Sequence, residues 1–250
     1  MLKNQTPINT ALIKWSKINE HLSYKHLNGD MTKNAHTIIL HSQKRKPNSL
    51  MGHFHKSNEE FYCLNGNFTF DGSFWFGANS YAFYPAYFVH GTAVNIKGGY
   101  TLYLRVSGEP TAYFVNFPQK ISPYPLEGTV TKDKPSQIQN SNEGLQQHYL
   151  LNDKSTWVSE LHIDKNTGTG SSVLCYSQNT SNLKNKVFNI KTNETIELFV
   201  LSGSFVLDEK TILSKNYYTC RTGENISLPL TCIASGKLLI SHKKPINITN

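Results

Sequence analysis

Four residues in the N-terminal half have the types and order of metal ligands, namely His53, His55, Glu59 and His90. Imidazole nitrogens combined with one carboxylate suit a first-row divalent metal of borderline softness. His53 and His55 are two residues apart, so on a β-strand both side chains point to the same face. The sequence therefore predicts one bound divalent metal, which could be iron, manganese, nickel or zinc because affinity order alone does not choose among them.

These ligands must be carried by at least three strands. Glu59 follows a short turn, Lys56-Ser57-Asn58, and precedes the strand-like run Glu60–Leu64, whereas His90 comes after two further strand-like runs. Inward-facing side chains of a small β-barrel can meet in this way. Glycine, proline, asparagine and serine are spread along the chain, as in proteins built from many short strands. We expect an all-β fold.

The bulk composition limits the partners. The 250 residues include 12% aromatic and 17% charged residues, as in a globular protein. The formal charge of +8 is scattered, with Lys44-Arg45-Lys46 as the longest basic cluster. Nucleic-acid-binding proteins concentrate such residues on one face, so we expect no nucleic-acid partner. No apolar stretch has the length of a bilayer span, so we expect no membrane partner.

The cysteines and the N terminus indicate the compartment. No signal peptide is visible, and no two cysteines form a C-x-x-C pair. We expect a cytoplasmic location, with buried free thiols at Cys63, Cys175, Cys220 and Cys232.

An internal repeat organises the chain. At an offset of 137 residues (203 − 66), Gly66–Asp71 lies over Gly203–Asp208 and Asn79 over Asn216. A gapless match of this length predicts two copies of one domain. The stretch between them is rich in proline and turn-forming residues, as linkers often are. The expected division is an N-terminal metal-binding domain at 1–117, a linker at 118–154 and a C-terminal domain without metal ligands at 155–250.

The second copy lacks the ligands. At the same offset, the four ligand positions are occupied by Ile190, Thr192, Ile196 and Ser227. Apolar residues there predict a filled core in place of a metal. Because the repeat does not need the histidines to fold, their presence in the first copy calls for a reason beyond packing.

The motifs also carry a family resemblance. His53-x-His55-x-x-x-Glu59, followed by six residues and Gly66, resembles the first sequence motif of the cupin superfamily, and Pro85–His90 resembles the second. The duplicated layout is similar to a bicupin of the ChrR-like group. The resemblance implies two tandem double-stranded β-helix, or jelly-roll, barrels with the metal inside the first.

The chain departs from the family pattern at two positions, Asn79 and Tyr87, where the family has glycine. Asparagine tolerates the left-handed backbone conformation, so the turn at Asn79 can form. We expect Tyr87 near the mouth of the barrel, where it would narrow access.

Strand alternation predicts further residues of a substrate pocket. Met51, Phe61 and Cys63 share parity with the ligands, whereas Glu60 is expected on the opposite face from Glu59. Arg105 could pair with a carboxylate substrate, or it could face solvent or an interface. The full set of pocket candidates is Met51, Phe61, Cys63, Tyr81, Phe83, Tyr87, Tyr103 and Arg105.

Two functions stay open, because a fold does not determine a reaction. The first is a metal-dependent enzyme, of oxygenase, lyase or isomerase type, that acts on a small organic molecule in the N-terminal barrel. The second is a non-catalytic metal-dependent sensor or small-ligand-binding cupin. The sequence carries no attached helical partner-binding domain, which favours the enzyme. A homodimer is compatible with the way cupins pair their barrels.

Overall fold

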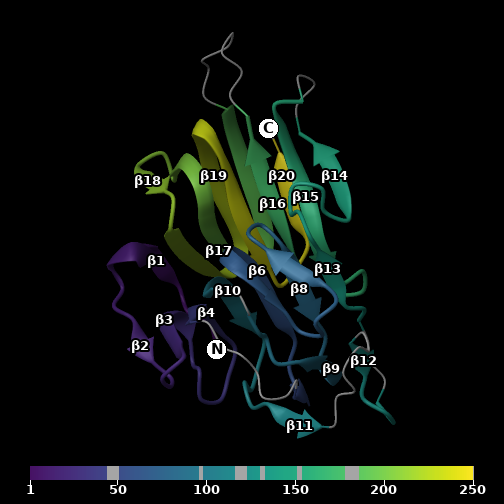
Figure 1. Cartoon of the computed structure of the whole chain (residues 1–250). Helices are drawn as coiled ribbons and strands as arrows, with labels where there is room; N and C mark the ends of the chain where they lie inside the picture. The colour runs from purple at the N-terminus through teal and green to yellow at the C-terminus, as the bar shows by residue number, and fades with distance from the viewer. Residues whose placement is uncertain are drawn as a thin grey trace. The chain divides into compact units, whose positions relative to one another are not determined.

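The computed structural model describes residues 1–43, 51–95, 98–115, 123–129, 133–150, 154–177 and 186–249. Within these ranges the protein consists of β-strands in curled sheets, and its one helical element is the 3-10 turn η1 (Thr10–Leu12) (Figure 1). The predicted all-β class is confirmed. No helix in the described ranges has the length and hydrophobicity needed to cross a membrane. The basic cluster at 44–46 lies outside the described residues.

The chain divides into two compact units. The first consists of Met1 and Ile13–Asn140, and the second of Leu2–Leu12 and Ser141–Asn250. This division differs from the expected ranges at the N terminus, because β1 (Gln5–Asn9) pairs with β19 (Tyr217–His242) of the second unit. It also differs at 133–140, which stay with the first unit through pairing of β13 (Ser136–Ile138). The expected boundary at 117–118 lies outside the described residues.

The first unit contains a large and a small antiparallel sheet. The large sheet has the order β13-β8-β6-β10-β4-β3-β2, with β7 paired to β6, and the small sheet has the order β11-β5-β9-β12. Besides β13, the strands are β2 (Ser16–Lys17), β3 (Leu22–Gly29), β4 (His36–Ser42), β5 (Gly52–Phe54), β6 (Glu59–Thr69), β7 (Trp75–Gly77), β8 (Tyr81–Tyr84), β9 (Phe88–Gly91), β10 (Tyr100–Val106), β11 (Tyr113–Val115) and β12 (Tyr124–Pro125).

The second unit is one sheet, ordered β14-β15-β16-β19-β17-β18, with β1 paired to β19 and β20 to β17. Ile196 of β17 lies opposite both Arg221 and His242 of β19, so β19 runs along both edges of β17 and the sheet curls. The remaining strands are β14 (Gln146–Tyr149), β15 (Thr156–Ile163), β16 (Gly170–Tyr176), β17 (Lys186–Leu207), β18 (Thr211–Ser214) and β20 (Ile246–Thr249).

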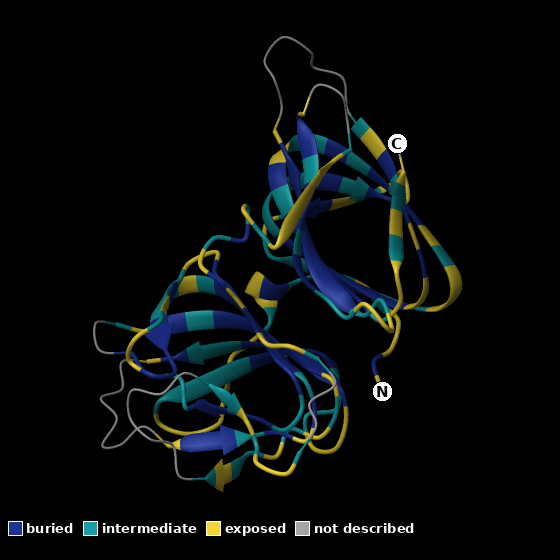
Figure 2. Ribbon diagram, turned by 90° about the vertical axis from the view of Figure 1, so that its right-hand side faces the viewer, coloured by how far each residue is buried: buried dark blue, intermediate teal, exposed yellow. Residues whose placement is uncertain are grey.

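Each unit has its own apolar core, and buried residues follow the strands of both units (Figure 2). In the first unit the core is mainly aromatic and includes Phe61, Phe68, Phe70 and Tyr84. In the second unit it is mainly aliphatic, as isoleucines, leucines and valines dominate it. Burial of these side chains is the main favourable term for each unit.

The pairing register of the two units repeats at the offset found in the sequence. Glu60 lies opposite Phe83, and Glu197 lies opposite Cys220 in the second unit. The turns repeat as well, since Asn79 and Asn216 have φ values of 70° and 72°. Asparagine adopts this left-handed conformation more readily than other non-glycine residues, which explains its recurrence.

Candidate metal centre

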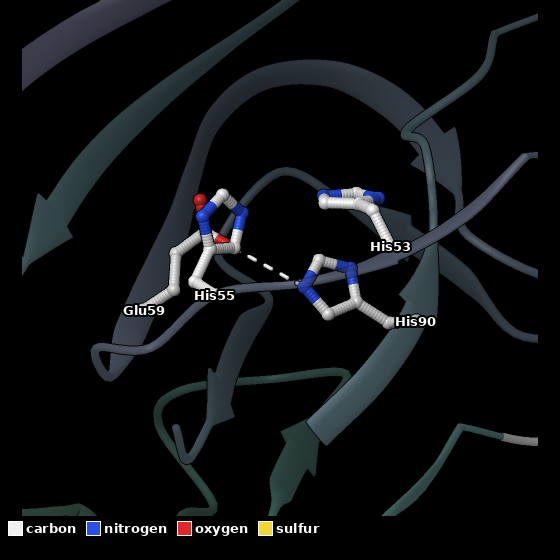
Figure 3. A group of neighbouring side chains, drawn as sticks. All are labelled: His53, His55, Glu59 and His90. Carbon is white, nitrogen blue, oxygen red and sulfur yellow. Dashed lines mark ion pairs between the residues drawn. The ribbon is translucent and has the colours of Figure 1, made fainter. Parts of the chain in front are cut away.

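The four predicted ligands come together in the first unit. His53, His55, Glu59 and His90 are all buried and offer ligand atoms that lie within 4.8 Å of one another (Figure 3). Glu59 Oε2 is 3.3 Å from His90 Nε2 and 3.4 Å from His55 Nε2. The rings of His53 and His90 are 4.4 Å apart between centroids. The arrangement converges on a volume that one ion can share.

Both sheets supply ligands. His53 lies on β5 directly opposite His90 on β9, so these two come from neighbouring strands of the small sheet. Glu59 begins β6 of the large sheet. The turn before it is held by Asn58. The backbone N–H of Asn58 donates to Ser107 Oγ, and its side-chain Oδ1 accepts from the Ala86 backbone N–H. The turn thus fixes where the carboxylate enters the site.

Backbone carbonyls orient two of the imidazoles. His55 Nδ1 donates to the Thr111 carbonyl and His90 Nδ1 to the Gly91 carbonyl, each at 3.1 Å. Because a carbonyl can only accept, the proton is on Nδ1, and in the neutral ring Nε2 carries a lone pair. Such contacts are typical of metal-bound histidines, since they fix the tautomer and the ring orientation.

The donor set fits a cation. In neutral rings the two Nε2 lone pairs face the Glu59 carboxylate with no proton between them. Glu59 Oε2 and His53 Nδ1 are buried and have no hydrogen-bond partner among the described residues. Buried polar atoms are almost always paired, and a divalent ion would satisfy all of these groups at once.

The charge states of the cluster also suit a metal. Burial alone would raise the pKa of Glu59, but the charge that the neighbouring imidazoles carry once protonated, together with the His90 hydrogen bond, outweighs it and lowers that pKa to about 2. Burial, together with His90 and His55, lowers the pKa of His53 to about 3 against the opposing effect of Glu59. At neutral pH the site therefore presents a carboxylate and a neutral His53, which are the forms that bind metal.

Acidification is expected to destabilise the metal-free protein through His53. Its pKa is about 3 when folded against an ordinary 6.5, so below pH 6.5 the unfolded chain binds a proton that the folded chain does not. Stability is thus lost as the pH falls from 6.5 towards 3, by about 2 kcal/mol between neutrality and pH 5. Urea unfolding of the wild type and of His53→Leu at both pH values tests this. An equal loss in both proteins would contradict the assignment.

Aromatic side chains pack around His90. Tyr84 stacks on the imidazole with centroids 4.4 Å apart and an interplanar angle of 14°, and Phe70 meets it edge-on at 5.2 Å. The Tyr84 hydroxyl accepts a hydrogen bond from Gln137 Nε2, and burial raises the pKa of Tyr84, so it stays neutral. Sequence reasoning missed Tyr84, Phe70 and Gln137, because only the β6–β8 pairing, the loop after β6 and the β8–β13 pairing bring them to the site.

Three of the pocket candidates, Phe61, Cys63 and Met51, differ in how far they are buried. Phe61 and Cys63 are buried in the core on the Glu59 side of β6, whereas Met51 is 49% exposed. Burial raises the pKa of Cys63 to about 12, and its thiol donates to the Asn65 carbonyl. A thiol with this pKa is not a nucleophile at neutral pH, so Cys63 is a buried core residue.

Four other candidates lie on the opposite face of the large sheet. Glu59 pairs with Tyr84 and Val106, which places Tyr84 and Val106 on the ligand side, and alternation then turns their neighbours away. Glu60 lies opposite Arg105, and their side chains form a buried ion pair of 2.8 Å. Four residues that the sequence predicted in the metal pocket therefore point away from it, namely Tyr81, Phe83, Tyr103 and Arg105.

Two other residues sit near the ligands without any signal in the sequence. His36 lies opposite Val106, in the same cross-strand row as Glu59, and is buried. Phe114 of β11 lies opposite His53, with ring centroids 6.0 Å apart, and is 58% exposed. Phe114 therefore marks the solvent side of the cluster.

Tyr87 is held in a left-handed conformation with φ of 64°. Its N–H donates to the His55 carbonyl, and its ring stacks on Phe54, with centroids 6.0 Å apart. Phe54 alternates with His53 along β5 and so points away from the ligands. Tyr87 therefore packs on the outer side of β5, not at the mouth of the pocket as expected from the sequence.

Two substitutions at Tyr87 test this placement. Tyr87→Gly is expected to be more stable than Tyr87→Ala by about 1 kcal/mol, because only glycine adopts positive φ without steric cost. Both variants lose the same stacking, so the comparison isolates the backbone. Denaturant unfolding measures it, and metal titration of both variants should give the wild-type affinity. A large drop in affinity would place Tyr87 at the site.

The second unit has filled the corresponding volume. Ile190 pairs with Leu228, so the strand ladder puts Leu228, and not the Ser227 found by gapless offset, opposite the His53 position. Ile190, Ile196 and Leu228 are buried in the aliphatic core. The Thr192 hydroxyl donates a hydrogen bond to the Pro245 carbonyl. Among the described residues, the one cluster able to hold a metal is that of the first unit.

Comparisons with known proteins agree with this fold. A family model described as the ChrR cupin-like domain matches residues 3–107. No curated protein sequence matches the chain.

Solved structures give more distant similarities. The chain is similar to a candidate dioxygenase from Nostoc punctiforme, with a TM-score of 0.73 and 12% identity over 96% of this chain and 82% of that one. It is similar to oxalate decarboxylase of Bacillus subtilis, studied for its Mn(II) centres, with a TM-score of 0.57 and 9% identity over 97% and 78%. It is also similar to a bacterial pirin from Escherichia coli in complex with nickel(II), with a TM-score of 0.52 and 9% identity over 98% and 100%. The family match covers residues 3–107, and the solved structures share the fold of this chain.

Proposed function

We propose that the protein is a bicupin whose N-terminal barrel binds one divalent transition metal and uses it to transform a small organic molecule, as an oxygenase, lyase or isomerase. The convergence of the His53, His55, Glu59 and His90 ligand atoms within 4.8 Å carries the proposal. The repeated register and the filled counterpart site support a second barrel of the same fold with a supporting role.

The residues around the ion have distinct roles. His53, His55, Glu59 and His90 would hold it, and a bound divalent metal acts as a Lewis acid that polarises a substrate oxygen. Four protein ligands leave coordination positions for small molecules. Tyr84, Phe70 and Phe61 exclude water from the His90 side, and the neutral Tyr84 hydroxyl keeps that wall uncharged. A small, partly apolar substrate suits such a wall.

Metal analysis and turnover test the proposal in sequence. Elemental analysis of the purified protein should give about one divalent metal ion per chain. Protein reloaded with iron, manganese, nickel or zinc is then incubated with a panel of small carboxylic and hydroxy acids under air, with product detection by mass spectrometry. We expect substrate loss with one metal and none after chelation. Metal binding without any turnover, coupled to metal-dependent capture of a protein partner, would favour a sensor instead.

A variant that copies the second unit separates metal loss from misfolding. The variant His53→Ile, His55→Thr, Glu59→Ile and His90→Leu carries the residues of the filled site. We expect it to bind no metal and to be at least as stable as the metal-free wild type. Replacing buried charged groups with well-packed apolar residues often raises the stability of a protein, by up to about 4 kcal/mol. Elemental analysis and thermal unfolding with and without chelator check this. A folded variant that keeps one metal ion would contradict the site.

A further inference from the structure

His36 is a buried histidine on the same face of the large sheet as the Glu59 carboxylate. It lies opposite Val106, and Val106 lies opposite Glu59, so the three residues form one row across β4, β10 and β6. Residues directly opposite each other in an antiparallel pair project to the same face. The backbones of Glu59 and His36 are two strand spacings apart, or about 10 Å. A small molecule bound at the metal cluster can therefore extend along this row towards His36.

The hydrogen bonding of His36 leaves one ring nitrogen available. Nδ1 donates to the Asn34 carbonyl at 3.0 Å, because a carbonyl can only accept. In the part of the chain that the structure describes, no group bonds to Nε2, and this atom is not one of the fully buried unsatisfied atoms. Burial lowers the pKa of His36, so at neutral pH the ring is neutral and Nε2 carries a lone pair. His36 can therefore accept a hydrogen bond from a bound molecule.

An apolar stretch separates His36 from the metal cluster. Val106, which lies between His36 and Glu59 in the row, is only 3% exposed and belongs to the apolar core. Ile38, two residues after His36 on β4, belongs to the same core. A molecule that reaches from the cluster to His36 crosses this apolar surface, so a partly apolar body suits it.

The metal end of the row favours an anionic group. The four ligands bring one negative charge, that of Glu59, because histidines bind metals as neutral imidazoles. A divalent ion held by this set keeps one net positive charge in a buried site. An uncompensated buried charge is unfavourable, and a carboxylate both neutralises it and offers an oxygen ligand.

We propose that His36 is a substrate-binding residue of the metal centre and selects small hydroxy acids whose hydroxyl lies at the end remote from the carboxylate. This inference rests on the proposed function and names its substrate class. The carboxylate lies at the metal, the apolar body crosses Val106, and the hydroxyl donates to His36 Nε2.

Two pairs of probes of similar shape test the hydrogen bond. 4-Hydroxybenzoate and 3-hydroxybenzoate carry a hydroxyl on a flat apolar ring, and 4-fluorobenzoate and 3-fluorobenzoate lack the donor. Full-length protein reloaded with zinc, with its metal content verified by elemental analysis, is titrated with each probe by calorimetry. At least one hydroxybenzoate should bind about five- to tenfold more tightly than its fluoro counterpart, the effect of one hydrogen bond. Equal affinities within both pairs, or no binding of any probe, would overturn the proposal.

Substitutions on β4 assign the preference to one residue. His36→Leu should abolish the preference for the hydroxyl, whereas His36→Gln, whose amide oxygen can accept, should retain part of it. His41→Leu is the matched control, because His41 lies on the same strand and alternates to the opposite face. Each preference is a ratio measured within one protein, so a general loss of affinity cancels. His36→Met replaces His36→Leu if that variant does not fold, and a full preference in the folded variant would refute the assignment.

Nitrogen NMR gives a readout that depends on neither affinity nor turnover. In zinc-loaded protein labelled with ¹⁵N, the Nε2 signal of His36 is identified by its absence in His36→Gln. It should shift when the preferred hydroxybenzoate binds and shift far less with the fluoro counterpart. An unchanged signal at saturation would contradict the contact.

The outcome is separable from that of the proposed function. A chain that takes up no metal contradicts the proposed function and the role of His36 together. A zinc-loaded chain whose probe binding does not depend on the hydroxyl contradicts the role of His36 alone.

Discussion

Replacement of His90 by alanine is expected to weaken divalent-metal binding by more than about a hundredfold. Loss of a residue that only orients a metal ligand already costs about 10–100-fold, and His90 is itself a ligand in this assignment. Its ring is also the one on which Tyr84 and Phe70 pack. The substitution therefore removes a donor atom and leaves a cavity beside Glu59, whose carboxylate loses a contact of 3.3 Å.

Competition titration against a fluorescent chelator, with manganese and zinc in parallel, measures this loss. His26→Ala is the matched control, because His26 is a histidine of the same unit that is exposed and lies on β3. The control should retain wild-type affinity. Near-normal affinity in His90→Ala, with a folded protein, would show that the ion is held elsewhere.

Replacement of Gly91 by alanine is expected to destabilise the first unit by more than about 3 kcal/mol. A Cβ atom on Gly91 would lie 1.8 Å from the Phe70 carbonyl oxygen, so the backbone of β9 or of the loop after β6 must move. Overpacking of this kind typically costs 1–3 kcal/mol, and here the obstacle is backbone, which cannot rotate away. Since the Gly91 carbonyl accepts from His90 Nδ1, the same movement should weaken metal binding.

Urea unfolding of the metal-free variant gives the free energy, and hydrogen exchange of peptides covering β5 and β9 locates the loss. Gly77→Ala is the control, since a Cβ there meets no atom within 4 Å. That control should change the unfolding free energy by less than about 0.5 kcal/mol. A Gly91→Ala protein with wild-type stability would show that the close approach to Phe70 is relieved at no cost.

The metal ligands were predictable because their signal is local. The His53, His55 and Glu59 spacing lies within one strand and one turn, and the aligned positions of the sequence repeat carry other residues. The left-handed turn at Asn79 was also predictable, because asparagine is among the few residues that accept that conformation.

The walls of the site were less predictable, because they depend on strand register. Pairing of Glu59 with Tyr84 and Val106 turns Tyr84 inwards and turns Phe83 and Arg105 outwards. A shift of one residue would reverse every one of these directions, and no short-range pattern in β8 or β10 marks the starting point. Sequence reasoning placed Glu60 on the face away from Glu59, as found, but left Arg105 to substrate, solvent or an interface and did not predict the buried Glu60–Arg105 pair.

The amino-acid sequence by itself determined the all-β class and the identity of the four candidate ligands, because hydrophobic alternation and motif spacing are properties of neighbouring residues. Only the tertiary structure decided that β1 joins the C-terminal unit and that Tyr84 and Phe70 enclose His90. These features arise from pairing and packing between segments far apart in the chain, and their energies depend on register and shape that no local pattern encodes.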